Sequence, residues 1–165
     1  MIRHAGLVAL RLHGRWAGAL IEGPSGVGKS DLAIRALHMG FRLAADDRTL
    51  VWASGGRLYG RAPGPLVGLI EARGQGVLPE SPLDLAEIVL LARCVTDATD
   101  IERLPEPQID TIAGIALPCL TLRPREASAP VKLRRAMEHL GAAAQQAYLA
   151  ASLGGRDRAG TGDTP

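Results

Sequence analysis

Two short apolar runs near the N-terminus are separated by a polar turn. Residues 6–12 (GLVALRL) and 17–23 (AGALIEG) flank the sequence HGRW, which predicts two strands joined by a turn. Leucine and alanine then recur at helical spacing in SDLAIRALHMG, residues 30–40, where Gly40 stands at the expected stop. The pattern predicts strand, turn, strand and amphipathic helix in this order.

The middle of the chain reads as strands punctuated by glycine. Residues 41–47 (FRLAADD) predict a strand that ends in two carboxylates, and residues 48–63 predict a hairpin that turns at a Gly-Gly pair. Residues 63–82 predict a strand followed by a glycine-punctuated loop. The apolar run at 86–95 (AEIVLLARCV) favours a buried strand because of its isoleucine and valine, although a helix entered at the preceding Ser-Pro pair is an alternative.

The C-terminal part adds two strands, a helix and a tail. Residues 104–124 predict a loop, a strand, a turn and a strand, and residues 129–151 predict a helix that opens near Pro130. The last stretch is polar and rich in glycine. We therefore expect one α/β domain over 1–150, built on a mixed sheet with flanking helices, and a flexible tail at 151–165.

Composition fits an ordinary globular protein. The chain has 165 residues, of which 47% are hydrophobic and 22% charged, enough for one domain with a buried core. Aromatic residues make up only 3%, so we expect a core of alanine, leucine, isoleucine and valine. A net charge of +2 is too small to indicate binding to nucleic acid or to a membrane surface.

Targeting and redox signals are weak. No apolar run approaches the roughly 18 residues of a membrane span, and the N-terminus MIRHAGLVALRLHG lacks the features of a signal peptide. Cys94 and Cys119 stand apart from each other and from any histidine cluster, so we expect buried, reduced thiols. Together these observations favour a cytoplasmic protein.

The sequence EGPSGVGKSD fits the P-loop pattern, in which a glycine and four residues precede Gly-Lys-Ser. The glycines let backbone N–H groups converge on phosphate oxygens, and the following helix directs its positive end at the same oxygens. Lys29 would add a charge at the phosphates of ATP, and the Ser30 hydroxyl can bind Mg²⁺. A structural glycine turn is the alternative. The expected nucleotide-binding residues are Gly23, Pro24, Ser25, Gly26, Val27, Gly28, Lys29 and Ser30.

Two adjacent carboxylates follow the strand after the helix. Asp46 and Asp47 would lie at its C-terminal end, where ligands bind in open α/β sheets. One carboxylate could take a proton from an attacking hydroxyl while the other helps to hold the metal. A pair that caps the turn of the next hairpin is the alternative interpretation.

These blocks together resemble a known family. GPSGVGKSDLAIRALHMGFRLAADD followed by GLIEARGQGVL is similar to the catalytic domain of the bacterial HPr kinase/phosphorylases, over roughly residues 2–140. The resemblance implies a fold related to phosphoenolpyruvate carboxykinase. It also implies an enzyme that uses ATP and Mg²⁺ to phosphorylate a serine of the phosphocarrier HPr, in phosphotransferase-system signalling. The same site would remove that phosphate by phosphorolysis.

The resemblance also implies roles for individual residues. Asp46 would be the general base in the forward reaction and, protonated, the acid in the reverse one. Asp47 would lie beside the metal and the substrate hydroxyl, and Glu71 would be a second metal-side carboxylate together with Ser30. Arg73 would steady phosphate charge or a mobile loop.

Two of these assignments have alternatives. A glutamate and an arginine two apart on a strand point to the same face, which suits a metal-and-phosphate pair, although Glu71 and Arg73 could instead form a surface salt bridge. The family carries a phosphate-facing histidine ahead of the P-loop. His4 is the expected match because it precedes the first strand, and His13 competes with it.

The chain also departs from the longer family members. We expect a short form that consists of the C-terminal catalytic domain only, because the first strand follows Met1 closely. Residues 78–102 contain no match to the basic loop that the family links to phosphorolysis, and a homo-oligomer is one possible assembly. A P-loop small-molecule kinase and a non-catalytic nucleotide-sensing module remain as alternatives. The arginine-rich segment 123–135 is either a solvated helix start or a surface for an acidic partner.

Overall fold

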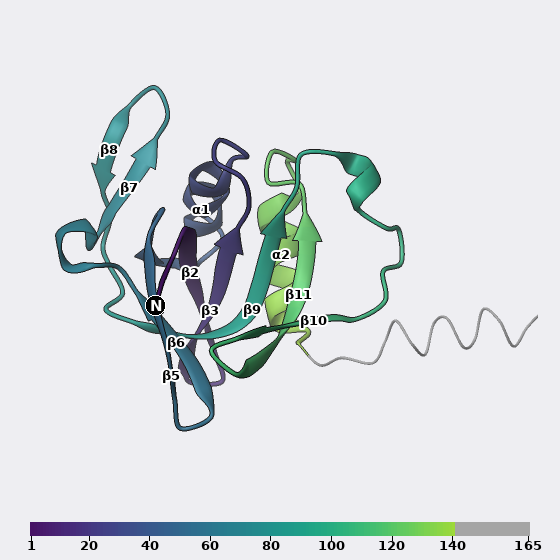
Figure 1. Cartoon of the computed structure of the whole chain (residues 1–165). Coiled ribbons are helices and arrows are strands. Elements are labelled where there is room, and N and C mark those ends of the chain that lie inside the picture. Colours follow the sequence, from purple (N-terminus) through teal and green to yellow (C-terminus); the bar gives the residue numbers. More distant parts are fainter. Residues whose placement is uncertain (141–165) are drawn as a thin grey trace, which may run out of the picture.

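A nine-stranded mixed sheet forms the centre of the protein in the computed structural model, which describes residues 1–140 (Figure 1). The expected tail at 151–165 and the end of the last expected helix lie outside the described residues. The main path of the sheet runs in the order β1 (Ile2–Arg3), β5 (Thr49–Ser54), β6 (Arg57–Arg61), β9 (Ala86–Cys94), β3 (Arg15–Glu22), β2 (Ala5–Leu12) and β4 (Arg42–Ala45). The branch off this path consists of β11 (Ile115–Leu122) and β10 (Gln108–Ile112).

Strand β9 is the point at which the sheet branches. It runs parallel to β3 along one edge. On its other edge the N-terminal half pairs with β6 in the antiparallel sense, whereas the C-terminal half pairs with β11 in the parallel sense. Since residues 86–94 pair with strands along both edges, the strand interpretation of residues 86–95 is confirmed, and the helix alternative is wrong.

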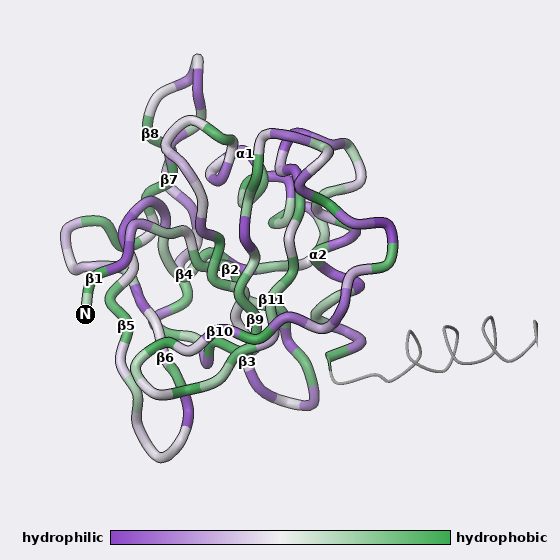
Figure 2. Tube along the Cα trace, turned by 45° about the vertical axis from the view of Figure 1, so that its right-hand side comes forward, coloured by the Kyte–Doolittle hydropathy of each residue, from purple (hydrophilic) through white to green (hydrophobic). Residues whose placement is uncertain are grey.

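Two helices cover one face of the sheet (Figure 1). Helix α1 (Lys29–Leu37) and helix α2 (Ala129–Glu138) pack on β2, β3 and β11 and bury leucine, alanine and methionine side chains against it. A second apolar cluster fills the opposite face, and Figure 2 shows the hydrophobic segments along the inner strands. Within residues 1–140, none of the largest fully buried side chains is aromatic, as the composition predicts.

The expected hairpins are confirmed with small shifts at their ends. β2 and β3 pair along their whole length around the turn at His13 and Gly14, and β5 pairs with β6 around Gly55 and Gly56. Helix α1 ends at Leu37, three residues before Gly40, which adopts a φ of +88°.

Residues 63–82 differ from the expected strand and loop. They form a short 3₁₀ turn (Gly64–Leu66) and then a separate antiparallel hairpin of β7 (Leu69–Ala72) and β8 (Gly76–Pro79). Gly74 and Gly76 have φ values of +87° and +94°, so the glycines that indicated a loop instead provide the turn of a hairpin. The hairpin projects from the body beside α1 (Figure 1).

The remaining observations concern a short turn, the two cysteines and the length of the helices. A second 3₁₀ turn (Ala98–Asp100) follows β9. Cys94 is buried and Cys119 is half-buried, and both are free thiols. No helix within residues 1–140 is long and apolar enough to cross a membrane.

Candidate active site

The loop between β3 and α1, residues 23–28 and here called the glycine loop, follows a path that favours glycine. Gly23, Gly26 and Gly28 have φ values of +153°, +76° and +113°, which other residues rarely adopt. A Cβ on Gly23 would lie 2.6 Å from the carbonyl oxygen of Cys94, so a side chain there would collide with the backbone that follows β9. The loop therefore turns tightly against the end of β9 before α1 begins.

Helix α1 starts directly at the end of the glycine loop. Its N-cap residue is Gly28, which has no side chain to cap the first turn, and the N–H groups at a helix start carry a partial positive charge. The Lys29 side chain is nearly buried, and its Nζ donates to the carbonyl oxygens of Gly23 (2.9 Å) and Pro24 (3.1 Å). A fixed ammonium group therefore stands beside the start of the loop.

The Asp46 carboxylate links the end of β4 to α1 and β7 through hydrogen bonds. Asp46 follows β4 and is only 6% exposed. One carboxylate oxygen accepts a hydrogen bond from Ser30 Oγ (2.9 Å), in the first turn of α1, and the other accepts one from the backbone N–H of Glu71 in β7 (3.0 Å). Burial raises the pKa of Asp46, the nearby Asp47 adds to the rise, and the two hydrogen bonds oppose it.

His4 and Asp47 lie at a corner of the sheet. The chain passes from β1 to β2 at His4, and this corner is fixed by the Thr49 hydroxyl, which donates to the Ala5 carbonyl (2.8 Å). His4 Nδ1 lies 3.2 Å from Asp47 Oδ1, and both side chains are more than half exposed. Asp47 has a φ of +60°, a left-handed conformation that aspartate tolerates better than most residues.

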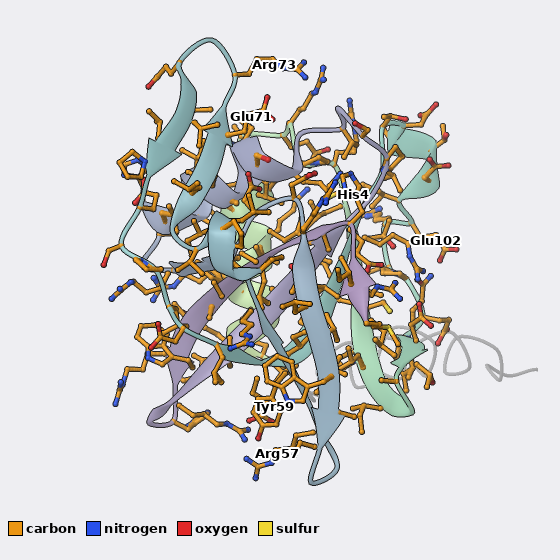
Figure 3. All side chains as sticks on the ribbon, turned by 60° about the vertical axis from the view of Figure 1, so that its left-hand side comes forward. His4, Arg57, Tyr59, Glu71, Arg73 and Glu102 are labelled. Carbon is orange, nitrogen blue, oxygen red and sulfur yellow. The ribbon has the colours of Figure 1, made fainter. Side chains whose placement is uncertain are left out.

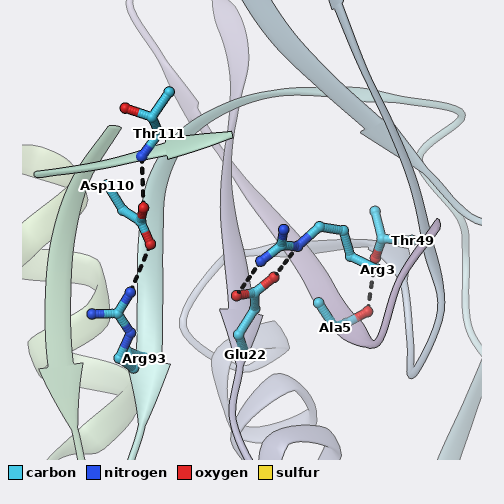
Figure 4. A network of polar contacts seen from close by, with 7 residues as sticks. All are labelled: Arg3, Ala5, Glu22, Thr49, Arg93, Asp110 and Thr111. Atoms are coloured by element: carbon cyan, nitrogen blue, oxygen red, sulfur yellow. Dashed lines mark hydrogen bonds and ion pairs between the residues drawn. The ribbon is translucent and has the colours of Figure 1, made fainter. Parts of the chain in front are cut away.

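A bidentate ion pair ties β1 to the strand that leads into the glycine loop. Arg3 donates through Nε and Nη2 to the two carboxylate oxygens of Glu22, the last residue of β3, at 2.5 Å and 2.8 Å (Figure 4). The neighbouring strands carry a second pair, Arg93 with Asp110 at 2.7 Å. Because His4 follows Arg3 directly, the first pair brings His4 to the same end of the sheet as the glycine loop.

These segments enclose a pocket of about 840 Å³. Its walls come from the β1–β2 corner, the glycine loop, α1, the residues after β4, the β7–β8 hairpin and the segment after β11. The lining residues are His4, Ser25, Gly26, Gly28, Lys29, Ser30, Asp31, Ile34, His38, Asp47, Ile70, Glu71, Ala72, Arg73, Gln75, Leu78, Glu80 and Arg125.

Comparison with known proteins connects this arrangement to one family. The model of the "HPr Serine kinase C-terminal domain" matches residues 3–83, which include the glycine loop, Asp46 and β7. The HPr kinase/phosphorylase of Limosilactobacillus reuteri (strain DSM 20016) is 33% identical over 148 residues, which cover 83% of this chain and 44% of that protein. The chain belongs to the HPr kinase/phosphorylase family. A second relative of the same name, from Clostridium botulinum (strain Eklund 17B / Type B), is 35% identical over 127 residues, or 68% of this chain and 42% of the relative.

A solved structure agrees with this family membership. The structure of the HPr(Ser) kinase/phosphatase from Coxiella burnetii superposes with a TM-score of 0.71, at 21% identity, over 84% of this chain and 94% of that one. At this identity the likeness concerns the fold alone, which is a mixed α/β fold with a curled sheet. The chain spans less than half the length of the curated family members that it matches.

The structure brings most of the residues expected for an HPr kinase/phosphorylase to one place. His4, Lys29, Ser30 and Asp47 line the pocket with Glu71, Arg73 and part of the glycine loop, and Asp46 lies directly behind Ser30. Val27 is different, because its side chain is buried in the apolar cluster beneath α1. His13 is placed in the β2–β3 turn, away from this pocket lining, and competes poorly with His4 on position.

Glu71 and Arg73 line one pocket wall, but only Glu71 lies on a strand. Strand β7 ends at Ala72, so Arg73 belongs to the turn that follows, where the Gln75 N–H donates to the Ala72 carbonyl. Both side chains are exposed and line the pocket, and Figure 3 shows them at the opposite end of the molecule from Tyr59. Within residues 1–140 neither takes part in an ion pair, which disfavours the surface salt bridge.

Two basic side chains, His38 and Arg125, stand out among the pocket residues that sequence reasoning did not assign. His38 is the C-cap of α1 and lines the pocket wall. Arg125 follows β11 and reaches the pocket from the far end of the chain. Its only signal in the sequence is the arginine-rich segment 123–135, which says nothing about where in the fold that segment lies.

Proposed function

We propose that this chain is the catalytic domain, residues 1–150, of an ATP-dependent serine protein kinase that phosphorylates an HPr-type phosphocarrier protein. The observation that carries the proposal is Asp46, a buried carboxylate with a raised pKa that is held between α1 and β7 behind two residues of the pocket lining, Ser30 and Glu71. Perturbed acids in such positions are typical of proton-transfer residues. The relatives that match the chain are named HPr kinase/phosphorylase.

The residues around the pocket suit a triphosphate. The glycine loop and the uncapped start of α1 offer N–H groups, and a Cβ at Gly26 would meet nothing within 4 Å, so this part of the loop is open to a ligand. Lys29 would place its charge near the outer phosphates, as its counterpart does in P-loop enzymes. ATP supplies the transferable phosphoryl group when it is bound.

Magnesium would be held by few protein ligands. Among residues 1–140 no cluster of three or more His, Cys, Asp or Glu side chains is arranged to bind a metal ion. Mg²⁺ in phosphoryl-transfer sites commonly takes one or two carboxylates and relies on phosphate oxygens and water for the rest. Ser30, Asp47 and Glu71, which line one pocket, would supply the protein ligands for such an ion.

Asp46 would move the proton in both directions. In the forward direction it accepts the proton of the carrier serine as the serine oxygen bonds to the γ-phosphorus and ADP departs. In the reverse direction, protonated Asp46 returns that proton to the serine oxygen as inorganic phosphate takes the phosphoryl group, which yields pyrophosphate. His4 and Arg73 would steady phosphate charge at the mouth of the pocket, and the 3.2 Å contact with Asp47 orients His4 for this role.

The sheet also supports a relationship to phosphoenolpyruvate carboxykinase. β3, which leads into the glycine loop, has β9 as a parallel neighbour and β2 as an antiparallel one. Doubly wound nucleotide-binding folds instead surround this strand with parallel neighbours. We therefore group the domain with the carboxykinase-like folds.

The test is the intact mass of a purified HPr carrier after incubation with this protein, ATP and Mg²⁺. An acid-stable gain of one phosphoryl group that is absent with Lys29→Ala supports the serine kinase. Adding inorganic phosphate to the product then tests phosphorolysis through loss of the same mass and release of pyrophosphate. If the wild-type protein binds ATP but leaves several HPr carriers unmodified, the proposed substrate is wrong.

A further inference from the structure

The segment between β11 and α2 packs directly on the glycine loop. A Cβ built on Gly28 would lie 3.4 Å from Arg125 Cγ and 3.6 Å from Pro124 Cγ. The guanidinium of Arg125 continues along the loop, and its Nη2 donates to the carbonyl oxygen of Gly26 at 2.9 Å. The side chain of Arg125 therefore runs along the glycine loop from Gly28 to the Gly26 carbonyl and lines the pocket.

Arg35 holds the backbone on both sides of Arg125. From α1 it donates through Nη1 to the Glu126 carbonyl (3.0 Å) and through Nη2 to the Pro124 carbonyl. Its Nε donates to Asp31, one turn earlier on the same helix (3.0 Å). These contacts fix the two residues that flank Arg125 to the helix that begins at the glycine loop. The base of the Arg125 side chain is thus positioned, whereas its end is bonded, among the residues that the structure describes, only to a neutral carbonyl.

The chemistry of this contact favours an anion over the present acceptor. Arg125 forms no ion pair within residues 1–140, although arginines of the same region do, such as Arg123 with Glu126. Hydrogen bonds from a guanidinium to a charged oxygen are about twice as strong as those to a neutral one, and the planar fork of arginine matches phosphate. The Gly26 carbonyl offers neither the charge nor the second oxygen of a phosphate group.

We propose that Arg125 is a further phosphate-binding residue of the site and that Arg35 is its positioning residue. The inference rests on the proposed function, because it requires the glycine loop to hold a nucleoside triphosphate. Arg125 would then bring a second positive charge to the phosphate site, delivered from a segment 99 residues away in the sequence from Gly26.

The test is the dissociation constant of ATP, ADP and AMP for purified variants, measured by calorimetry in the presence of Mg²⁺. Arg125→Ala should weaken ATP binding on the order of 10-fold or more, and the factor should shrink from ATP to ADP to AMP. Arg125→Lys should recover part of the loss, since it keeps the charge but not the fork. Arg123→Ala is the matched control, two residues away on the same segment, and should leave all three constants unchanged.

A structural brace would give a different pattern. If Arg125 only supports the glycine loop, Arg125→Ala weakens the three nucleotides by one common factor, and that result, like no change at all, overturns the proposal. For Arg35, a double-mutant cycle provides the readout: Arg35→Met should cost ATP affinity in the wild-type background but little more in the Arg125→Ala background. Additive losses would overturn the positioning role.

Lys29→Ala separates the two proposals. If the wild-type protein binds ATP, Lys29→Ala weakens it and Arg125→Ala does not, only the assignment of Arg125 fails. If the wild-type protein binds no nucleotide, the proposed function and the role of Arg125 fail together.

Discussion

Asp46→Asn tests whether the buried carboxylate is used for proton transfer. Asparagine has nearly the same shape, and it can direct its carbonyl oxygen at the Glu71 N–H and its amide at the Ser30 oxygen, since a hydroxyl accepts as well as donates. Both hydrogen bonds of Asp46 are thus replaced, while the proton acceptor is lost. We expect the HPr phosphorylation rate to fall on the order of 10²–10⁴-fold, or about 3–5 kcal/mol in the barrier, with ATP affinity nearly unchanged.

Asp46→Asn should lower activity, but it should raise the stability of the protein relative to wild type as the pH increases. Burial raises the pKa of Asp46 above its ordinary value, so the folded protein resists ionisation of this group. The neutral form contributes stability that is fully present below the unfolded-state pKa, near pH 4, and that is lost as the pH rises through the raised folded-state pKa. The amide of the substituted side chain cannot ionise. The stability of Asp46→Asn relative to the wild-type protein should therefore increase from pH 4 to pH 7.

Urea unfolding at several pH values measures this difference, and Asp46→Ala is the control. Alanine leaves the Glu71 N–H without its acceptor, which costs about 1–3 kcal/mol when the group is buried. The reasoning is refuted if Asp46→Asn is destabilised by the same amount at every pH, or if it keeps wild-type phosphorylation activity. The first result would mean that folding does not raise the pKa of Asp46. The second would mean that Asp46 serves the fold alone, as a cap of the turn between β4 and β5.

Three further predictions each rest on the surroundings of one residue. Gly23→Ala should shift the glycine loop and abolish ATP binding, because its Cβ would lie 2.6 Å from the Cys94 carbonyl oxygen; calorimetry measures the loss. Cys94 should resist a thiol reagent at pH 8 in the folded protein and react after unfolding, since burial raises its pKa to about 12; intact mass counts the adducts. Thr49→Val should lower the unfolding free energy by about 1–2 kcal/mol in urea, because the Ala5 carbonyl loses its buried hydroxyl donor.

The strands and first helix were predictable because their signals are local. β2 and β3 read as apolar runs around a His-Gly turn, and their pairing follows from the shortness of that turn. The stop of α1 was placed within three residues because Gly40 adopts the left-handed conformation that other residues avoid. In each case the residues that decide the structure are neighbours in the sequence.

The β7–β8 hairpin shows where local signals become ambiguous. Gly74 and Gly76 mark a turn in either interpretation, and the four residues from Gly76 to Pro79 are too few to display a period of two. The end of β7 at Ala72 then decides that Arg73 lies in the turn, which no sequence pattern could determine to one residue. The strand assignment of Arg73 differs for this reason, whereas both side chains line one pocket.

The composition of the pocket depends on how distant strands are ordered. Asp46 reaches the Glu71 amide only because the segment after β6 folds back beside α1, and Arg125 reaches Gly26 only because β11 lies parallel to β9 at the branch of the sheet. A motif can identify the glycine loop and the paired carboxylates, since each is contiguous. It cannot identify Arg125, whose neighbours in the sequence are ordinary helix-start residues and whose place is set by Arg35, on the helix that the motif begins. Arg125 is linked to the motif by a contact with α1 and not by a nearby position in the sequence. Its role therefore has to be tested directly in this chain.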